Sequence, residues 1–233
     1  MAEKESNSLA GIELLDALDV TERGALERGC SWRRYGPHEQ ILDQQSETSD
    51  VCFVVDGKVR VVNYSMTGRE ITLDDVGEGS YFGELAAIDG EPRSASVMAL
   101  ENTLIAFMPR AVFVDMLRSH PDVAFGLMHR LARIIRTSTE RIMDLSTLGA
   151  NNRVHAELLR QARAVAGEEA NEAVLKPIPV HGDVASRVST TRETVARVMN
   201  DLARKGIVER RKDSLVITDL IELEDLVEKV RGD

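Results

Sequence analysis

The stretch FGELAAIDGEPRSASV, from Phe82 to Val97, decides how the N-terminal half of the chain is interpreted. It brings a carboxylate (Glu84), a guanidinium (Arg93) and a hydroxyl (Ser94) together around a short helical segment. A buried phosphate needs a fixed cation, and arginine is preferred because its planar guanidinium carries several donors. A carboxylate can accept a hydrogen bond from a sugar hydroxyl. The stretch therefore predicts a site for a small ligand that carries a phosphate and a ribose.

The backbone of this stretch contributes to the same prediction. Gly83 precedes the helical turn Glu84-Leu85-Ala86, whose free amides can point at a phosphate. Because glycine has no Cβ, the main chain at Gly83 can approach a ligand closely. Taken singly, a glutamate and an arginine form a surface pair more often than a ligand site. The complete segment is a more specific signal for a ligand site, because it contains a matching residue for each polar group of such a ligand.

Short strand-like segments surround this stretch, from Trp32 to Pro109. Turn residues separate these segments at short, regular intervals. Residues 51–62 are expected to form a hairpin, in which Asp56-Gly57 supplies the tight turn. Short strands with this punctuation are typical of an antiparallel barrel or jelly roll.

A long helix is expected from Pro121, which is tolerated in a first helical turn, to about Leu148. Its apolar residues recur at alternating steps of three and four, the pattern of a coiled-coil seam. An exposed seam needs a partner helix, and an identical chain is the simplest one, so a homodimer is predicted. The alternative is an ordinary core helix packed within its own domain. The seam consists of Met128, Leu131, Ile135, Ile142 and Leu145.

One position of this seam, Ser138, is polar. Polar residues at such positions commonly set the register of two helices. In the functional alternative, Ser138 and the adjacent Thr139 contact the base of a ligand bound near the dimer axis. Both interpretations stay open at this point.

Beyond the seam, Gly149 to Asn152 is expected to end the helix as a hinge. A further helix over residues 153–165 and a loop over residues 166–179 follow. Two short strands, around residues 207–210 and 215–218, predict a β-wing. An acidic helix is expected from about Leu220.

The segment TTRETVAR, residues 190–197, indicates a helix-turn-helix. Its first helix is predicted from Asp183 to Val188, and Thr190 with Glu193 forms a capping-box pattern at the start of the second helix. The residues expected to face inward on the two helices are Val184, Ala185, Val188, Val195, Val198, Met199 and Leu202.

The opposite face of the second helix carries Arg192, Glu193 and Arg197 near its N-terminal end, where recognition helices contact base edges. Arginine can pair with guanine and glutamate can accept from cytosine N4. The alternative is a solvated face with an i,i+4 ion pair. Further candidates for contacts with DNA phosphates are Arg187, Thr191 and Lys212.

The charge distribution agrees with a local DNA-binding surface. The chain of 233 residues has a net charge of −10, which argues against indiscriminate binding of nucleic acids. From Gly182 to Lys212, however, eight Lys and Arg residues stand against four Asp and Glu residues. An acidic protein with one basic face can dock on DNA in a defined orientation.

Other classes are excluded or disfavoured. No apolar run is long enough to span a bilayer and the N-terminus lacks a secretory pattern, so a cytoplasmic protein without membrane contact is expected. Cys30 and Cys52 are too few for a disulfide framework and wrongly spaced for a zinc or iron–sulfur site. No nucleophile–base pair or metal-ligand cluster indicates an enzyme. A nucleotide-regulated enzyme or scaffold subunit is therefore the least supported alternative.

The two motifs, FGELAAIDGEPRSASV and RETVAR, together resemble the catabolite activator protein (Crp/Fnr) family of transcription regulators. The resemblance covers roughly Trp32 to Thr218. It implies an α+β fold in three parts: a jelly-roll-like β-roll that binds cyclic nucleotides (residues 1–120), a dimerisation helix with a hinge (121–149) and a winged helix-turn-helix (150–233).

The resemblance also implies the ligand. Cyclic AMP is favoured, with cyclic GMP or dual use as the alternative. Ser138-Thr139 reverses the family's Thr-Ser order, which leaves the base preference open. No iron–sulfur cluster is expected without N-terminal cysteines, and His38 and His120 lack a haem-specific context. The implied ligand contacts are Gly83, Glu84, Leu85, Ala86, Arg93, Ser94, Ser138 and Thr139.

For DNA, the resemblance implies half-sites similar to TGTGA in an inverted repeat, with Arg192, Glu193 and Arg197 reading the G·C pairs. Double-stranded DNA, a second copy of the chain and RNA polymerase are the expected partners. The sequence thus predicts a cyclic-nucleotide-activated transcription regulator. The alternative is a regulator of the same fold that is constitutive or gated by another effector.

Overall fold

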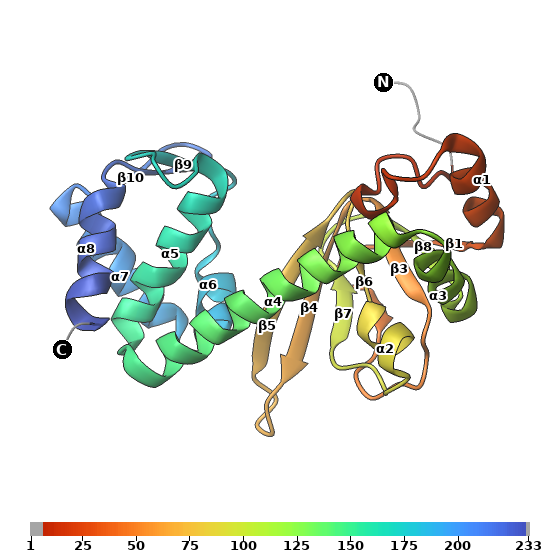
Figure 1. The fold of residues 1–233 in the computed structure, drawn as a ribbon. Helices are drawn as coiled ribbons and strands as arrows, with labels where there is room; N and C mark the ends of the chain where they lie inside the picture. The colour runs from red at the N-terminus through yellow and green to blue at the C-terminus, as the bar shows by residue number, and fades with distance from the viewer. Residues whose placement is uncertain (1–6, 232–233) are drawn as a thin grey trace. The chain divides into compact units, whose positions relative to one another are not determined.

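The computed structural model describes residues 7–231, and of residues 230 and 231 only the backbone. The chain divides into two compact units, residues 1–133 and 134–233, and each has its own hydrophobic core (Figure 1). The division falls inside the long helix α4 (Pro121–Thr147). Each unit is therefore described by itself.

Within the described part of the first unit, the strands form two antiparallel sheets of four strands each. The strand order is β1-β8-β3-β6 in one sheet and β2-β7-β4-β5 in the other. This arrangement confirms the predicted β-roll. The strands are β1 (Ser31–Tyr35), β2 (Gln40–Leu42), β3 (Val51–Asp56), β4 (Lys58–Tyr64), β5 (Glu70–Gly77), β6 (Tyr81–Phe82), β7 (Ser96–Ala99) and β8 (Thr103–Met108).

Two apolar clusters hold the first unit together. One includes side chains of both sheets, among them Val54, Val59 and Ile105, which are fully buried. The other packs the outer face of the sheet that contains β3 against helical segments, and Phe53 and Phe113 are its largest fully buried members. The segments are η1 (Glu13–Leu15), α1 (Val20–Gly29), α3 (Arg110–Ser119) and the start of α4.

The predicted hairpin over residues 51–62 is wrong. β3 pairs with β6 and β8, whereas β4 pairs with β5 and β7, so the chain passes from one sheet to the other at Gly57. The turn itself is present, because Gly57 has a φ of +86°. The Asp-Gly pair predicts this local turn, but it does not determine which strands pair with β3 and β4. That pairing is determined by burial of the inner faces of both sheets.

Helix α4 matches the expected long helix. The seam residues Met128, Ile135, Ile142 and Leu145 are exposed in the single chain, and Leu131 is half-buried. An apolar stripe of this length is suited to a partner helix. The assignment of these residues to a dimer contact stays a prediction.

The second unit contains α5 (Ala150–Ala166), α8 (Leu220–Arg231) and the helix-turn-helix, α6 (His181–Arg187) with α7 (Arg192–Lys205). A three-stranded antiparallel sheet has the order β10-β11-β9. Its strands are β9 (Ala173–Leu175), β10 (Val208–Arg210) and β11 (Leu215–Ile217). This winged helix-turn-helix completes the predicted α+β fold.

Two expectations for the second unit need correction. Gly149 is the N-cap of α5, so residues 150–152 belong to the first turn of this helix and not to a hinge. The expected loop over residues 166–179 contains β9, a short strand that pairs with β11. Its three residues are too few to give a recognisable sequence pattern, and the strand forms because it pairs with β11.

Among the residues described, no helix has the length and apolarity that crossing a membrane requires.

Candidate ligand site and DNA-reading surface

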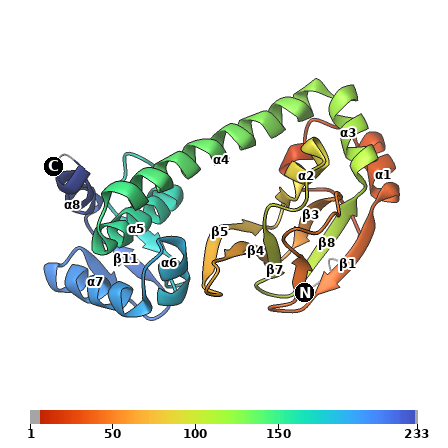
Figure 2. The same cartoon turned by 90° about the horizontal axis from the view of Figure 1, so that it is seen from below.

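The candidate ligand site begins where β6 ends. Gly83 follows Phe82 with a φ of +82°, a left-handed conformation that favours glycine, and is the N-cap of α2 (Glu84–Asp89). A Cβ at this position would lie 2.6 Å from Nη1 of Arg93. Gly83 is therefore needed both for the turn and for the close approach of the guanidinium. Helix α2 lies against α3 (Figure 2).

Arg93 is 2% exposed, and all three of its guanidinium nitrogens donate hydrogen bonds to the chain. Nε donates to Thr48 Oγ1 (3.0 Å), Nη1 to Gly83 O (2.8 Å) and Nη2 to Asp50 O (2.7 Å). Burial lowers the pKa of Arg93, while Cys52, Asp50 and Glu84 act in the opposite direction. Arginine stays protonated in proteins, so the site contains a fixed positive charge.

Glu84 supplies a buried carboxyl group in the same unit, with 6% of its surface exposed. Burial raises its pKa, and its own backbone N–H, Arg130 and Arg93 act in the opposite direction. Of the other predicted ligand contacts, Ala86 is buried, whereas Leu85 and Ser94 are exposed. The structure thus brings the predicted carboxylate and guanidinium into one electrostatic environment.

Several residues of this site are not predicted by the sequence. Thr48 and Asp50 hold Arg93 in place but precede it by more than forty residues, in a loop without a motif. Arg130, on α4, donates to Ser80 Oγ (2.5 Å) and Tyr81 O (2.6 Å). The only sequence signal for Arg130 is a basic residue within an amphipathic helix.

Ser138 and Thr139 lie in the second unit, on the exposed side of α4. Thr139 Oγ1 donates to the carbonyl of Ile135 (2.9 Å), one turn earlier in the helix. This bond within the helix leaves the hydroxyl oxygen able to accept. The role of both residues toward a base stays a prediction.

The candidate DNA-reading surface is centred on α7. Its N-cap is Thr191, whose Oγ1 accepts from the amide of Thr194 (3.2 Å). The predicted capping box from Thr190 to Glu193 is therefore wrong by one residue, because the amide of Thr190 still bonds to Ala185 O and belongs to the turn. Glu193 is exposed, and its own backbone N–H and the Thr191 hydroxyl lower its pKa.

The two arginines of this face make contacts within the unit. Arg192 lies over Gly182 on α6, where an added Cβ would come within 2.9 Å of Arg192 Nε. Arg197 Nη2 donates to Asn151 Oδ1 on α5 (3.4 Å). Both side chains are exposed, as is Lys212 in the turn between β10 and β11. All three are available to a nucleic acid that approaches α7 and the wing.

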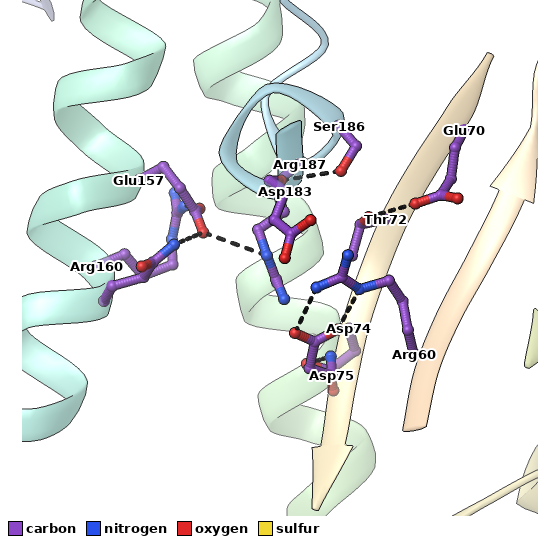
Figure 3. Close-up of polar contacts among 11 residues, drawn as sticks. Arg60, Glu70, Thr72, Asp74, Asp75, Glu157, Arg160, Asp183, Ser186 and Arg187 are labelled. Carbon is purple, nitrogen blue, oxygen red and sulfur yellow. Dashed lines mark hydrogen bonds and ion pairs between the residues drawn. The ribbon is translucent and has the colours of Figure 1, made fainter. Parts of the chain in front are cut away.

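Arg187 has a different environment. Its Nε lies 3.9 Å from Oε1 of Glu157, a buried carboxylate that also accepts from Arg160 and Gln161. Figure 3 shows Glu157 between Arg160 and Arg187. We therefore interpret Arg187 as a link between α5 and α6.

Elsewhere in Figure 3, in the first unit, Arg60 forms a bidentate pair with Asp75 across β4 and β5.

Arg153, another residue that sequence patterns do not reveal, connects the start of α5 to the turn of the helix-turn-helix. Its Nη1 donates to Leu148 O (3.0 Å), and Nε and Nη2 donate to Val188 O (2.9 Å) and Ser189 O (3.2 Å). Three bonds from one planar group fix both segments at once. The orientation of α7 is thus tied to the break between α4 and α5.

Comparison with known proteins agrees with this organisation. Residues 32–120 match the model of the cyclic nucleotide-binding domain, and residues 152–226 match that of the Crp-like helix-turn-helix domain. The chain is 32% identical over 195 residues to the cyclic AMP receptor protein of Thermus thermophilus, a match that covers 83% of this chain and 87% of the relative.

Solved structures with the same fold include a mutant of CooA from Carboxydothermus hydrogenoformans, with a TM-score of 0.76, 23% identity and coverage of 88% of this chain and 90% of that chain. Another is the c-di-GMP responsive global regulator CLP of Xanthomonas campestris, with a TM-score of 0.69, 17% identity and coverage of 85% and 99%. At these identities the two structures support the fold alone.

Proposed function

Because the chain belongs to the Crp/Fnr family of transcription regulators, we propose that it is activated by a cyclic nucleotide, with cyclic AMP as the favoured ligand. The family consists of regulators and not of enzymes, and the chain has both a cyclic nucleotide-binding and a helix-turn-helix domain. We assign the ligand to the first unit and DNA to α7 and the wing. The functional division into residues 1–120, 121–149 and 150–233 belongs to the same proposal.

The observation that carries the proposal is the buried pair of Arg93 and Glu84. A cyclic nucleotide has one phosphate charge and a free ribose hydroxyl. Arg93 uses one hydrogen of each guanidinium nitrogen within the chain, which leaves one on Nη1 and one on Nη2 for phosphate oxygens. Glu84 provides the acceptor for the ribose hydroxyl. A fixed cation and an acceptor in one buried site match these two groups.

For the switch, we propose a homodimer joined along the α4 seam, with Ser138 and Thr139 facing the base. A ligand shifts an equilibrium only by its differential affinity for the two arrangements. Contacts from α4 to the base supply such a difference. The two α7 helices of a dimer enter successive major grooves when they are about 34–36 Å apart. Ligand-dependent movement of α4 sets this spacing.

On DNA, we propose an inverted repeat of half-sites similar to TGTGA, read by Arg192, Glu193 and Arg197. RNA polymerase is the proposed partner of the bound dimer, and the cytoplasm is the proposed location. A spacing of about 34–36 Å is general for helix-turn-helix dimers, of which the catabolite activator protein is one.

A second candidate is a regulator of the same fold that is constitutive or gated by another effector. It is favoured by the three bonds from Arg93 to the chain, since a guanidinium engaged in this way also stabilises the fold without a ligand. The c-di-GMP responsive relative shows that effectors within this fold differ.

A selection of DNA sites from a random library distinguishes the candidates. The full-length protein is incubated with cyclic AMP, with cyclic GMP or with neither. Enrichment of an inverted repeat only with a nucleotide supports the proposal and identifies the base. Equal enrichment in all three samples contradicts it and supports the constitutive alternative.

A further inference from the structure

Asn200 lies on the exposed face of α7, in the same row as two residues that we assign to base reading. Val195, Val198 and Leu202 form the buried side of this helix. The opposite side carries exposed residues at steps of four, three and four, a spacing that keeps side chains on one helical face. These residues are Glu193, Arg197, Asn200 and Arg204. Asn200 therefore extends the candidate DNA-reading surface by almost one turn beyond Arg197.

The structure of the helix does not account for an asparagine at this position. Asparagine is less favourable than alanine in a helix interior, and its amide is commonly used at a cap or a turn. Asn200 lies in the interior of α7, whose caps are Thr191 and Gly206. Among the described residues, no hydrogen bond engages the amide of Asn200. The donors and the acceptor of this amide are therefore available to a ligand.

The neighbours of Asn200 leave its amide accessible. Arg197, Ala203 and Arg204 line the same open depression on the surface of α7 as Asn200. The methyl group of Ala203 is small, and Arg204 forms an ion pair with Asp201. Asn200 and Arg197 thus face the same open space, in which a nucleic acid can lie.

Distances along the helix decide which residues of the row can reach base edges. A helix rises about 1.5 Å per residue, so Asn200 lies about 4.5 Å beyond Arg197 and about 10.5 Å beyond Glu193. The major groove is about 12 Å wide, and successive base pairs are about 3.4 Å apart. Asn200 can therefore reach the base pair next to the one at Arg197 while Glu193 also contacts a base. Arg204 lies about 16.5 Å beyond Glu193, outside this range.

The chemistry of an amide indicates which base Asn200 recognises. In C₂H₂ zinc fingers, residues three positions apart on the reading helix contact successive bases. The G·C pairs of the proposed half-site are assigned to Arg192, Glu193 and Arg197, whereas no residue is assigned to its A·T pairs. Asparagine can form a bidentate pair with N6 and N7 of adenine in the major groove. The amide of Asn200 therefore matches a base that the other proposed readers do not recognise.

We propose that Asn200 is a further specificity-determining residue, which recognises an adenine next to the guanine that Arg197 reads. This inference rests on the DNA-reading part of the proposed function. It assigns to Asn200 a contact with a base and not with a phosphate. The salt dependence of DNA binding reflects the charges that neutralise phosphates. Because asparagine is neutral, its substitution should change the preferred sequence and leave the salt dependence unchanged.

The test is a fluorescence anisotropy competition assay of the full-length protein with cyclic AMP. Selection from a random library gives the starting duplex, and Arg197→Ala identifies the guanine that Arg197 reads. In one half-site, each base pair beside this guanine is then replaced by the other pairs. Asn200→Ala removes the amide and Asn200→Gln retains it. Lys205→Ala is the matched control, because Lys205 is exposed on α7 but lies outside the row.

For the wild-type protein and Lys205→Ala we expect a preference of about 5- to 150-fold for adenine at one of these positions. Asn200→Ala should reduce this preference to about twofold or less and leave the preferences at the G·C pairs unchanged. Asn200→Gln should still prefer adenine, because glutamine can form the same amide pairing. Alanine is favourable within a helix, so Asn200→Ala should fold, and circular dichroism checks this for each variant.

The outcomes that contradict the proposal differ from those that contradict the proposed function. If Asn200→Ala keeps every base preference of the wild type, Asn200 does not read a base. An equal loss of affinity of Asn200→Ala on all duplexes also overturns the proposal, because it indicates a phosphate contact. So does a wild-type preference for other bases on both sides of the guanine. In these cases the proposed function stands. If the wild-type protein selects no DNA sequence, the proposed function fails and this inference fails with it.

Discussion

Substituting Gly83 by alanine should disturb the ligand site in a way that the structure allows us to estimate. The φ of +82° costs a residue with a Cβ about 1–2 kcal/mol. The added Cβ would also lie 2.6 Å from Arg93 Nη1 and 3.4 Å from Asp50 O. Arg93 cannot retreat easily, because it is 2% exposed and held by three hydrogen bonds.

Losing one charge-assisted hydrogen bond of this kind costs about 1.5–3 kcal/mol. Gly83→Ala should therefore destabilise the first unit by about 2.5–5 kcal/mol. Gly68→Ala is the matched control, since Gly68 has a φ of +75° and no atom lies within 4 Å of its ideal Cβ. This control should show only the backbone cost of about 1–2 kcal/mol.

Urea unfolding followed by circular dichroism measures both costs, and calorimetry with cyclic AMP measures the effect on the ligand. Under the proposed function, Gly83→Ala should weaken cyclic AMP binding about 10–100-fold, which corresponds to about 1.4–2.8 kcal/mol, while Gly68→Ala should leave it unchanged. Equal destabilisation by the two substitutions would refute the reasoning, because the contact with Arg93 would then contribute nothing.

Three further predictions concern other parts of the chain. Glu193→Ala should relax discrimination at one base pair and lower DNA affinity by about 1–3 kcal/mol; an equal loss on every sequence in a competition assay would mean a structural role. Gly182→Ala should stabilise α6 by up to about 1 kcal/mol, because its φ is not left-handed, yet displace Arg192 and weaken specific DNA binding. Equal affinity of Gly182→Ala and wild type for specific DNA, measured by fluorescence anisotropy titration, would contradict this effect. The hydrogen bond from His120 to Glu22 (3.1 Å) raises the pKa of His120. The stability that this bond contributes is therefore fully present below the pKa that His120 has in the unfolded chain, and it is lost as the pH rises through the higher pKa of His120 in the folded protein. His120→Gln should thus destabilise the protein more at about pH 5.5 than at about pH 8.5, and an equal effect at both values would argue against this coupling.

Local signals in the sequence predict a structural element correctly where the interactions that form it lie within one short segment. Pro121 correctly predicts the start of α4, and the inward pattern of Val184, Ala185 and Val188 correctly predicts buried residues of α6 and the turn after it. The Asp-Gly pair likewise predicts the turn at residue 57. In each case the determining interaction lies within a few residues of the signal.

Predictions that depend on distant partners are less successful. The Asp-Gly turn predicts a hairpin, although β3 and β4 belong to different sheets. Thr191 caps α7 in place of Thr190, because the bond from Thr190 to Ala185 extends the turn by one residue. Spacing rules describe neither the strand partner nor the last residue of a turn.

The same reason explains which parts of the candidate site the sequence does not reveal. Gly83, Glu84 and Arg93 lie in one ordered string, whereas Thr48 and Asp50 support Arg93 only when the sheets assemble. Arg187 is basic and lies near the recognition helix, but the buried Glu157 on α5 pairs with it. Only the tertiary structure reveals this pairing, and a contact of Arg187 with DNA stays a prediction.

The central claim, that a nucleotide in the first unit controls DNA binding by the second, has a direct test. The affinity of the full-length protein for a duplex with two TGTGA half-sites in inverted repeat is measured at fixed salt, with and without cyclic AMP, for wild type and Arg93→Leu. We predict that cyclic AMP tightens binding by the wild-type protein and has no effect on Arg93→Leu. Equal affinity of the wild-type protein with and without cyclic AMP, or unchanged stimulation of Arg93→Leu, would contradict the claim.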